Sequence, residues 1–247
     1  MYLFNGKDAP KYALMFRTLA LIIGLGSLVL QILINIYVKE RFMVNHSWAF
    51  FTIQTNIIVI LFFLFLVIKT MVSFFKTKEL KVAKVNTVIH LGVTFYATFT
   101  MIVYWLTLAP GVGVGFVPLT ILNNLILHLF MPLFIICDCI FYMQHGVTEK
   151  KAVLYWLIYP AIYLIMIIIN AQLINEPFYT IKVGGENIPL MYPYSFLDPQ
   201  VMSIGGSVIS IMLLTLIFTA LGLLFLFLDT RINKKIIRHN AKKLANN

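Results

Sequence analysis

Charge is the scarcest feature of this sequence. Of its 247 residues, 11% are Asp, Glu, Lys or Arg, whereas 61% are hydrophobic and the mean hydropathy is +0.92. A soluble domain is typically about 25% charged, because polar groups must cover its surface. The deficit excludes an ordinary soluble fold and predicts a chain solvated by a lipid bilayer. The length leaves room for one domain, residues 1–247.

Several familiar motifs are also missing. The chain contains no internal repeat, heptad pattern, P-loop, dinucleotide-binding fingerprint, CxxC or HExxH. Its two cysteines, Cys137 and Cys139, lie two apart in one apolar run, so on a helix they point in different directions and do not readily form a disulfide. The first apolar run is too long for a signal peptide, and we expect none to be cleaved. We also expect no metal, no cofactor and no nucleic acid partner.

What is present is a series of long apolar runs. Spanning the hydrocarbon takes roughly 20 apolar residues. Six runs qualify: about Tyr12–Val38, Trp48–Phe74, Val85–Leu108, Leu119–Tyr142, Ala152–Ile174 and Val201–Leu228. The fold class expected is therefore an all-α membrane protein with six transmembrane helices. The longest connection, at 175–200, carries four prolines and five aromatic residues.

The distribution of Lys and Arg predicts the orientation. If the N-terminus is cytoplasmic, the inner segments hold fifteen of these residues and the outer loops hold three. Cytoplasmic loops carry an excess of Lys and Arg. We therefore expect both termini to be cytoplasmic. The basic C-terminal tail can also contact anionic lipid head groups.

Polar side chains gather at the start of the second run, HSWAFFTIQTN. Ser47 is a candidate N-cap for this helix. Thr52, Thr55 and Asn56 follow on one face, at spacings of three and four residues. Such groups at membrane depth are the first place to look for function. Each of them alone is also compatible with hydrogen bonding between helices.

The fourth run contains the segment LNNLILHLFMP, in which Asn124 and His128 lie four residues apart on one face of the helix. Pro132 follows four residues after His128. A proline cannot donate to the carbonyl four residues back, and that carbonyl belongs to His128. We expect the helix to kink at His128, which leaves the carbonyl as an acceptor for a side chain or water. A neutral imidazole beside irregular backbone favours a polar cavity, and a structural histidine is the alternative.

Three other intramembrane features have simpler interpretations. Asp138 lies near the inner end of the fourth run, where an interfacial carboxylate is the simplest interpretation. His90 lies near the inner end of the third run, and we interpret it as interfacial or structural. Tyr155, Tyr159 and Tyr163 form a stripe of spacing four in the fifth run, which is typical of packing.

Four segments together, WAFFTIQTN, LNNLILHLFMP, YWLIYPAIY and MYPYSFLDP, resemble the family of androgen-induced and androgen-dependent TFPI-regulating proteins and its bacterial relatives. The resemblance covers all six runs. It implies intramembrane hydrolysis by a threonine, since characterised animal members cleave fatty acid esters of hydroxy fatty acids with an essential Thr and His. It also implies an integral, multi-pass protein of a bacterial cell membrane, with a membrane lipid as substrate.

The family pattern can be carried over residue by residue. Its Trp-x-Phe-x-Thr pattern falls on Trp48, Phe50 and Thr52, and its Leu-Asn…His…Pro pattern falls on Leu122, Asn123, His128 and Pro132. The last pair is four residues apart here, where the animal enzymes have five. One residue rotates a helix by about 100°, so the threonine match is the closer of the two.

The leading hypothesis makes Thr52 the nucleophile and His128 the general base. The candidates for orienting the imidazole or stabilising the oxyanion are Asn56, Asn124 and Asn123. The candidates for substrate contacts are Thr55, Trp48, Tyr194 and Asp198, the last two from a possible lid formed by the outer loop 175–200. If His128 is not the base, His46 is the next candidate.

Two other functions stay open. A small-solute carrier or channel would use the same polar band as a binding site. A haem or quinone redox protein would use His90 and His128, although these are expected in opposite halves of the membrane. The substrate, the oligomeric state and the choice between a bacterial plasma membrane and an endoplasmic reticulum are not determined by the sequence.

Overall fold

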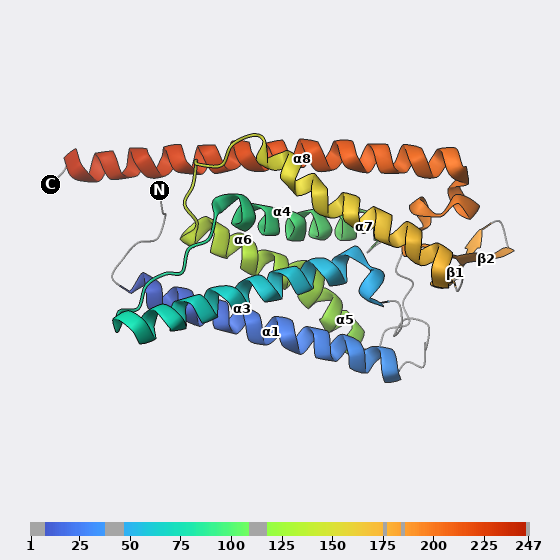
Figure 1. The fold of residues 1–247 in the computed structure, drawn as a ribbon, viewed down its shortest axis with the longest axis horizontal. Coiled ribbons are helices and arrows are strands. Elements are labelled where there is room, and N and C mark those ends of the chain that lie inside the picture. The colour runs from blue at the N-terminus through green and yellow to red at the C-terminus, as the bar shows by residue number, and fades with distance from the viewer. Residues whose placement is uncertain (1–7, 38–46, 109–117, 175–176, 184–185, 246–247) are drawn as a thin grey trace.

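The computed structural model describes residues 8–37, 47–108, 118–174, 177–183 and 186–245 and is predominantly helical (Figure 1). The α-helices are α1 (Ala9–Tyr37), α3 (Phe51–Thr77), α4 (Thr87–Val103), α5 (Pro118–Leu125), α6 (Met131–Tyr142), α7 (Ala152–Ile174) and α8 (Pro199–Ala245). The remaining elements are the 3-10 turns η1 (Ser47–Ala49) and η5 (Ser195–Leu197), the π-helical segments η2 (Tyr104–Leu108) and η4 (Ile126–Phe130), and the antiparallel strands β1 (Tyr179–Val183) and β2 (Glu186–Leu190).

Six helices are long and apolar enough to cross a membrane, which confirms the expected fold class. The element α5–η4–α6 forms one of them, and its range Leu119–Tyr142 is the one predicted. The other spans start or end within a few residues of prediction, with one exception. α8 continues to Ala245, well past the predicted end at Leu228. Lys, Arg, Ala and Leu in this tail all favour helix, so a charged sequence ends the span without ending the helix.

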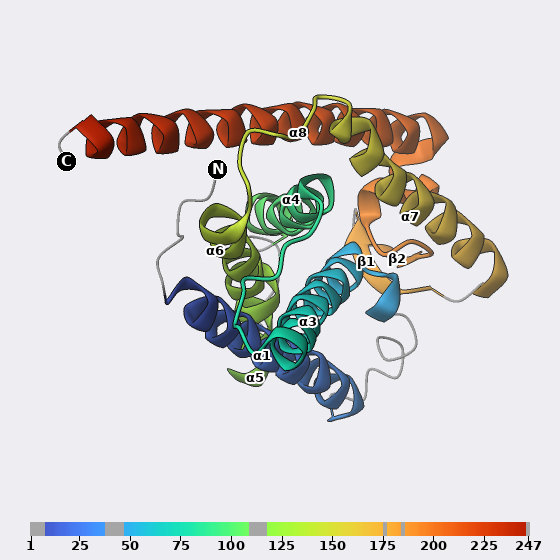
Figure 2. The ribbon, with the colours of Figure 1, turned by 60° about the vertical axis from the view of Figure 1, so that its left-hand side comes forward.

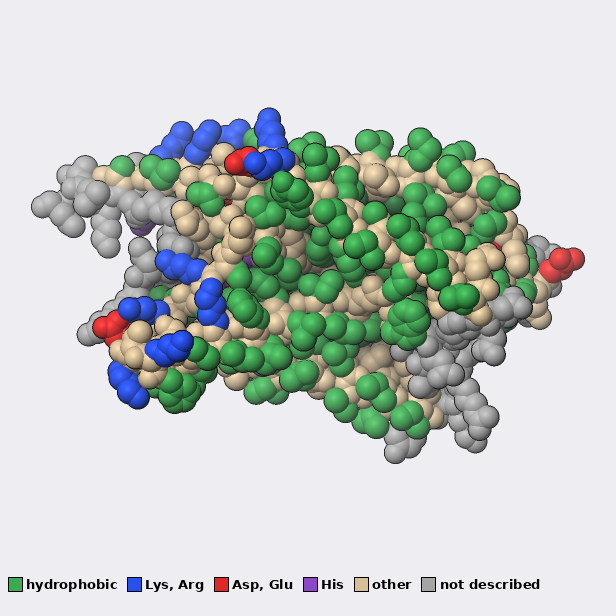
Figure 3. Space-filling view, viewed as in Figure 1, with side chains coloured by type: hydrophobic (Ala, Val, Ile, Leu, Met, Phe, Trp, Pro, Cys, Tyr) green, Lys and Arg blue, Asp and Glu red, His purple; other side chains and the backbone are tan. Residues whose placement is uncertain are grey.

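The outside of the bundle is suited to lipid. Only 17% to 50% of the most apolar window of each span is buried, so at least half of each window is partly or fully exposed on the bundle. Figure 3 shows hydrophobic side chains over the middle of the molecule, with Lys and Arg gathered toward one end. The first and last helices begin and end at this same end (Figure 1). It is the end that we predict to be cytoplasmic.

The helices form two groups. α1, α3 and α6 pack together around one apolar cluster, whereas α7 and α8 cross on the other side of α4 (Figure 2). Close approach in the first group depends on Gly24, because a Cβ there would lie 2.6 Å from Ile60 and 2.8 Å from Met131. Between α4 and α7, a Cβ on Gly92 would lie 2.6 Å from Nε1 of Trp156. Small residues at these crossings allow the helix backbones to come close.

Candidate functional site

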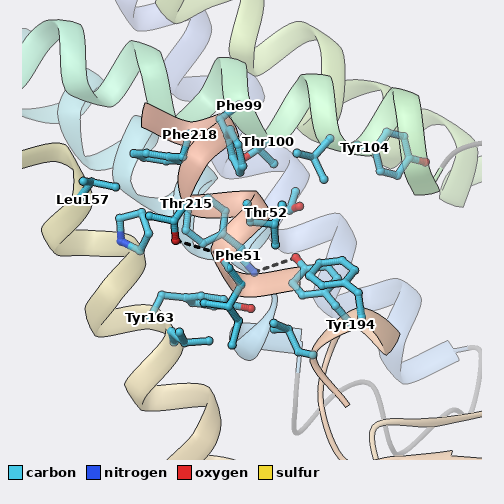
Figure 4. A pocket seen from close by; sticks show the side chains of 17 residues that line it. Phe51, Thr52, Phe99, Thr100, Tyr104, Leu157, Tyr163, Tyr194, Thr215 and Phe218 are labelled. Carbon is cyan, nitrogen blue, oxygen red and sulfur yellow. Dashed lines mark hydrogen bonds between the residues drawn. The ribbon is translucent and has the colours of Figure 1, made fainter. Parts of the chain in front are cut away.

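A cavity of about 130 Å³ lies among α3, α4, α7, α8 and the segment that precedes α8 (Figure 4). Aromatic and aliphatic side chains form most of its walls. The lining residues that carry hydroxyl groups are Thr52, Thr100, Tyr104, Tyr163, Tyr194 and Thr215. Thr215 is exposed on α8, so the cavity reaches the outer surface of the bundle. In a bilayer this surface faces lipid, which gives an apolar chain a way in.

Thr52 lies in the first turn of α3, on the cavity wall. The cap position of α3 is Phe50, which makes no side-chain capping bond. The predicted cap, Ser47, belongs to the separate turn η1, so that prediction is wrong. Instead, the N–H of Phe51 donates to the hydroxyl of Tyr194 at 3.2 Å. The first N–H groups of a helix lack partners within it, and here a phenol from far along the chain accepts one of them.

The tyrosine stripe of α7 holds the same turn. The hydroxyl of Tyr163 donates to the carbonyl of Ala49 at 2.9 Å, and that of Tyr159 donates to Oε1 of Gln54 at 3.2 Å. Tyr155, about two turns before Tyr163 in the helix, is exposed. Two members of the stripe therefore pack α7 against the start of α3, as their spacing indicates.

Tyr194 is fixed in place by its neighbours. Its ring stacks on Phe196 with centroids 5.2 Å apart and meets Phe50 edge-on at 5.9 Å. Burial raises the pKa of Tyr194 to about 12, against a smaller opposing effect of its hydrogen bond with the Thr52 side chain. The phenol is therefore protonated at neutral pH. Tyr194 therefore lies against the start of α3, beside Thr52.

Asp198 and Trp48, two other residues of the group of predicted substrate contacts, do not line the cavity. Asp198 is fully buried, and its two carboxylate oxygens accept the N–H of Met191 at 2.7 Å and the N–H of Gln200 at 2.9 Å. It is the N-cap of α8, and backbone donors occupy both oxygens. Trp48 is 43% exposed and does not line the cavity.

The fourth span is irregular around His128, as Pro132 predicts. The helix widens into the π-helical segment η4 just before Pro132. Nε1 of Trp105 donates to the carbonyl of His128 at 3.0 Å. Because the proline has no N–H for that carbonyl, the indole satisfies it. The prediction that Pro132 releases this acceptor to a side chain is confirmed.

The ring of His128 is buried and oriented. Its Nδ1 lies 3.0 Å from the carbonyl oxygen of Asn124. A carbonyl can only accept, so Nδ1 carries the proton and Nε2 keeps the lone pair. One face of the ring stacks on Tyr104, with centroids 3.5 Å apart and planes inclined by 18°. Asn124 therefore orients the imidazole as predicted, but through its backbone and not its amide.

Thr52 and His128 approach each other without lining the same cavity. Tyr104, a wall residue, lies against the imidazole. Asn56 joins the two backbone segments, since its Nδ2 donates to the carbonyls of Thr52 at 2.9 Å and Leu127 at 3.1 Å. One nitrogen bridging both oxygens keeps them within about 6 Å of each other. Asn56 thus braces the backbone, and the Thr–His dyad stays a prediction.

Asn123 and Thr55 are buried away from the cavity. In Asn123, Oδ1 accepts from the hydroxyl of Ser27 at 2.6 Å and Nδ2 donates to Gln31 at 2.8 Å, both on α1. Thr55 lies 3.5 Å from the hydroxyl of Thr100 on α4. These contacts join helices. Both side chains are therefore engaged between helices, and the oxyanion and substrate roles predicted for them stay predictions.

The sequence interpretation missed an ionic cluster toward the end of the bundle where the termini lie. Arg17 donates to Asp138 at 2.6 and 3.1 Å and to the carbonyl of Ala83 at 3.2 Å. Nε2 of His90 lies 3.1 Å from the same carboxylate. Asp138 has no exposed surface, so it is an ion-paired group inside the bundle, which its interpretation as an interfacial carboxylate did not include. The sequence signal for this cluster was that Arg17, His90 and Asp138 are ionisable and are expected at similar depth in three different spans.

A second missed pair lies where α8 leaves the bundle. Nδ1 of His145 is 2.7 Å from Asp229, and Nε2 is 2.9 Å from the carbonyl of Ile140. The second oxygen of Asp229 accepts the N–H of Gly146 at 2.8 Å. These bonds fasten α8 to the segment after α6.

Within the described ranges, no group of three or more His, Cys, Asp or Glu side chains is arranged to hold a metal ion. His46, the alternative base, lies outside the described residues. Comparisons with protein-family models, with curated proteins and with solved structures find no match.

Proposed function

We propose that this protein is an intramembrane hydrolase of a lipid ester, with Thr52 as the nucleophile. The observation that carries the proposal is the position of Thr52: its hydroxyl-bearing side chain lines an apolar cavity that reaches the lipid-facing surface. A carbonyl group attached to an acyl chain fits such a site, because the walls match the chain and the hydroxyl groups match the ester.

A threonine hydroxyl is a weak nucleophile until a base removes its proton. His128 is the base in this proposal, and the tautomer that leaves Nε2 unprotonated supports it. Asn56 supports it as well, since it holds the backbone of Thr52 beside that of Leu127, the neighbour of His128. Tyr104 is the residue common to both, since it lies against the imidazole and also forms part of the cavity wall that Thr52 lines.

The shape of the cavity favours an acyl substrate. Its walls include Phe99, Leu157, Leu164 and Phe218, which offer no hydrogen-bonding groups from their side chains. About 130 Å³ holds only a short stretch of hydrocarbon, so the rest of a long chain would extend into the bilayer. The family resemblance adds fatty acid esters of hydroxy fatty acids as the substrate class and a bacterial cell membrane as the location.

A fluorophosphonate probe tests the proposal. The purified protein should be labelled and should cleave a medium-chain ester, and Thr52→Ala should abolish both. The matched control is Thr70→Ala, which removes another buried threonine hydroxyl near the opposite end of α3. Equal labelling of wild type and Thr52→Ala, or absence of labelling in both, would contradict the proposal.

A small-solute carrier is the second candidate. The cluster of Arg17, Asp138 and His90 favours it, because coupled carriers use ionisable groups inside the membrane. Against it, the carboxylate is already paired with a bidentate guanidinium. Solute uptake into proteoliposomes that survives Thr52→Ala would favour the carrier.

A further inference from the structure

The hydroxyl of Tyr194 has a hydrogen-bonding capacity that capping does not use. It accepts the N–H of Phe51 at 3.2 Å through a lone pair of its oxygen. Capping a helix needs only this acceptor, so the phenol proton is available to a second partner, and the hydroxyl groups of Thr52 and Tyr163 lie within hydrogen-bonding reach of it. The same residue lines the cavity beside Thr52, as Figure 4 shows. A carbonyl oxygen placed between the two hydroxyl groups would be within reach of that proton.

We propose that Tyr194 is a catalytic residue that donates a hydrogen bond to the oxyanion formed when Thr52 attacks the ester. This inference rests on the proposed function and adds a group that its dyad lacks. It replaces the oxyanion role predicted for the asparagines, whose amides or carbonyls are committed to helix packing and backbone support.

The chemical step is balanced. Oγ of Thr52 forms a bond to the carbonyl carbon as its proton passes to Nε2 of His128, and the π electrons of the C=O bond move onto the carbonyl oxygen. Tyr194 donates to this oxygen while its own oxygen accepts from Phe51. Collapse of the tetrahedral intermediate expels the alcohol, which takes the proton from the imidazole. Water then releases the acid from Thr52 by the same steps.

Two features suit Tyr194 to this role. The N–H at the positive end of α3 pulls electron density from the phenolic oxygen, which strengthens the phenol as a donor. Its ring is already held between Phe196 and Phe50, so little reorganisation accompanies the reaction. The pKa of about 12 keeps it protonated, which makes it a donor and not a base.

Substitution Tyr194→Phe keeps the ring and removes the hydroxyl. We expect kcat for a medium-chain ester to fall about 100- to 1000-fold while KM changes little, as for loss of one oxyanion donor. The control is Tyr192→Phe, which alters a partly buried tyrosine of the same segment that does not line the cavity. It should match wild type.

Binding of a transition-state analogue separates catalysis from capping. A medium-chain trifluoromethyl ketone forms an oxyanion on Thr52, whereas the corresponding ether forms none. Tyr194→Phe should lower the affinity for the ketone by a factor similar to the loss in kcat and leave the affinity for the ether unchanged. If Tyr194 only capped α3, its substitution would lower the affinities for the ketone and the ether together. Incorporation of a fluorotyrosine at position 194, which retains every contact and strengthens the donor, should tighten the ketone.

The outcomes distinguish this inference from the proposed function. If wild type is labelled and active but Tyr194→Phe binds the ketone and turns over within about twofold of wild type, the role of Tyr194 is wrong and Thr52 remains the nucleophile. Equal weakening of ketone and ether also overturns it. If wild type neither cleaves esters nor binds the ketone, both proposals fail.

Discussion

Removal of the charge on Asp138 should be among the most destabilising isosteric changes in this protein. Asp138→Asn preserves volume but leaves the guanidinium of Arg17, only 1% exposed, without its counter-ion. Two unit charges about 4 Å apart interact with about 4 kcal/mol at an effective dielectric constant of about 20. Breaking a buried pair by removing one partner costs about 3–5 kcal/mol, because the other charge remains desolvated. We expect a loss in this range.

An exposed pair provides the matched control. Lys81 and Glu79 are 2.8 Å apart, close to the 2.6 Å between Arg17 and Asp138, but their side chains are 61% and 68% exposed. Water solvates each partner when the other is removed. Glu79→Gln should therefore leave the unfolding transition unchanged. The two ion pairs therefore differ in burial while their N–O distances are nearly equal.

Reversible unfolding in mixed micelles, followed by circular dichroism, measures these free energies. The double variant Arg17→Met with Asp138→Leu should be more stable than either single variant, because no charge is left buried and unpaired. A loss below about 1 kcal/mol for Asp138→Asn would refute the reasoning, since it would mean that water reaches Arg17. Additive losses in the double variant would refute it as well.

Three other predictions follow from the fold. A cysteine at Lys182 should react with an impermeant thiol reagent added outside the cell and one at Lys81 should not, as the charge distribution requires; the reverse pattern would overturn the orientation. Trp105→Phe should lower stability by about 1–3 kcal/mol in the same unfolding assay, because the carbonyl freed by proline in η4 loses its donor. Gly92→Val should sharply reduce the yield of folded protein by gel filtration, because its side chain would collide with Trp156, and the smaller Gly92→Ala should be affected less.

Composition and hydropathy were sufficient to predict the six membrane-spanning helices. A chain with 11% charged residues and six apolar runs has few folded alternatives, because backbone groups in lipid must be satisfied within helices. Pro132 was equally informative, since its missing N–H acts on a residue four positions away in the same helix. Its effect on the carbonyl of His128 is local chemistry, and the sequence predicted it.

Long-range pairing was decided only by the tertiary structure. Asp138 meets Arg17 across 121 positions of sequence, and the start of α3 finds its acceptor in Tyr194 across 143. Asn123, one of the three asparagines predicted to orient the imidazole or stabilise the oxyanion, turns toward α1 and not toward His128. Which face of one helix meets which face of another depends on how all six pack together, and hydrophobicity is nearly uniform around helices that lipid surrounds. The apolar pattern therefore determines that each helix exists, whereas side-chain fit and polar pairing determine what its polar groups contact.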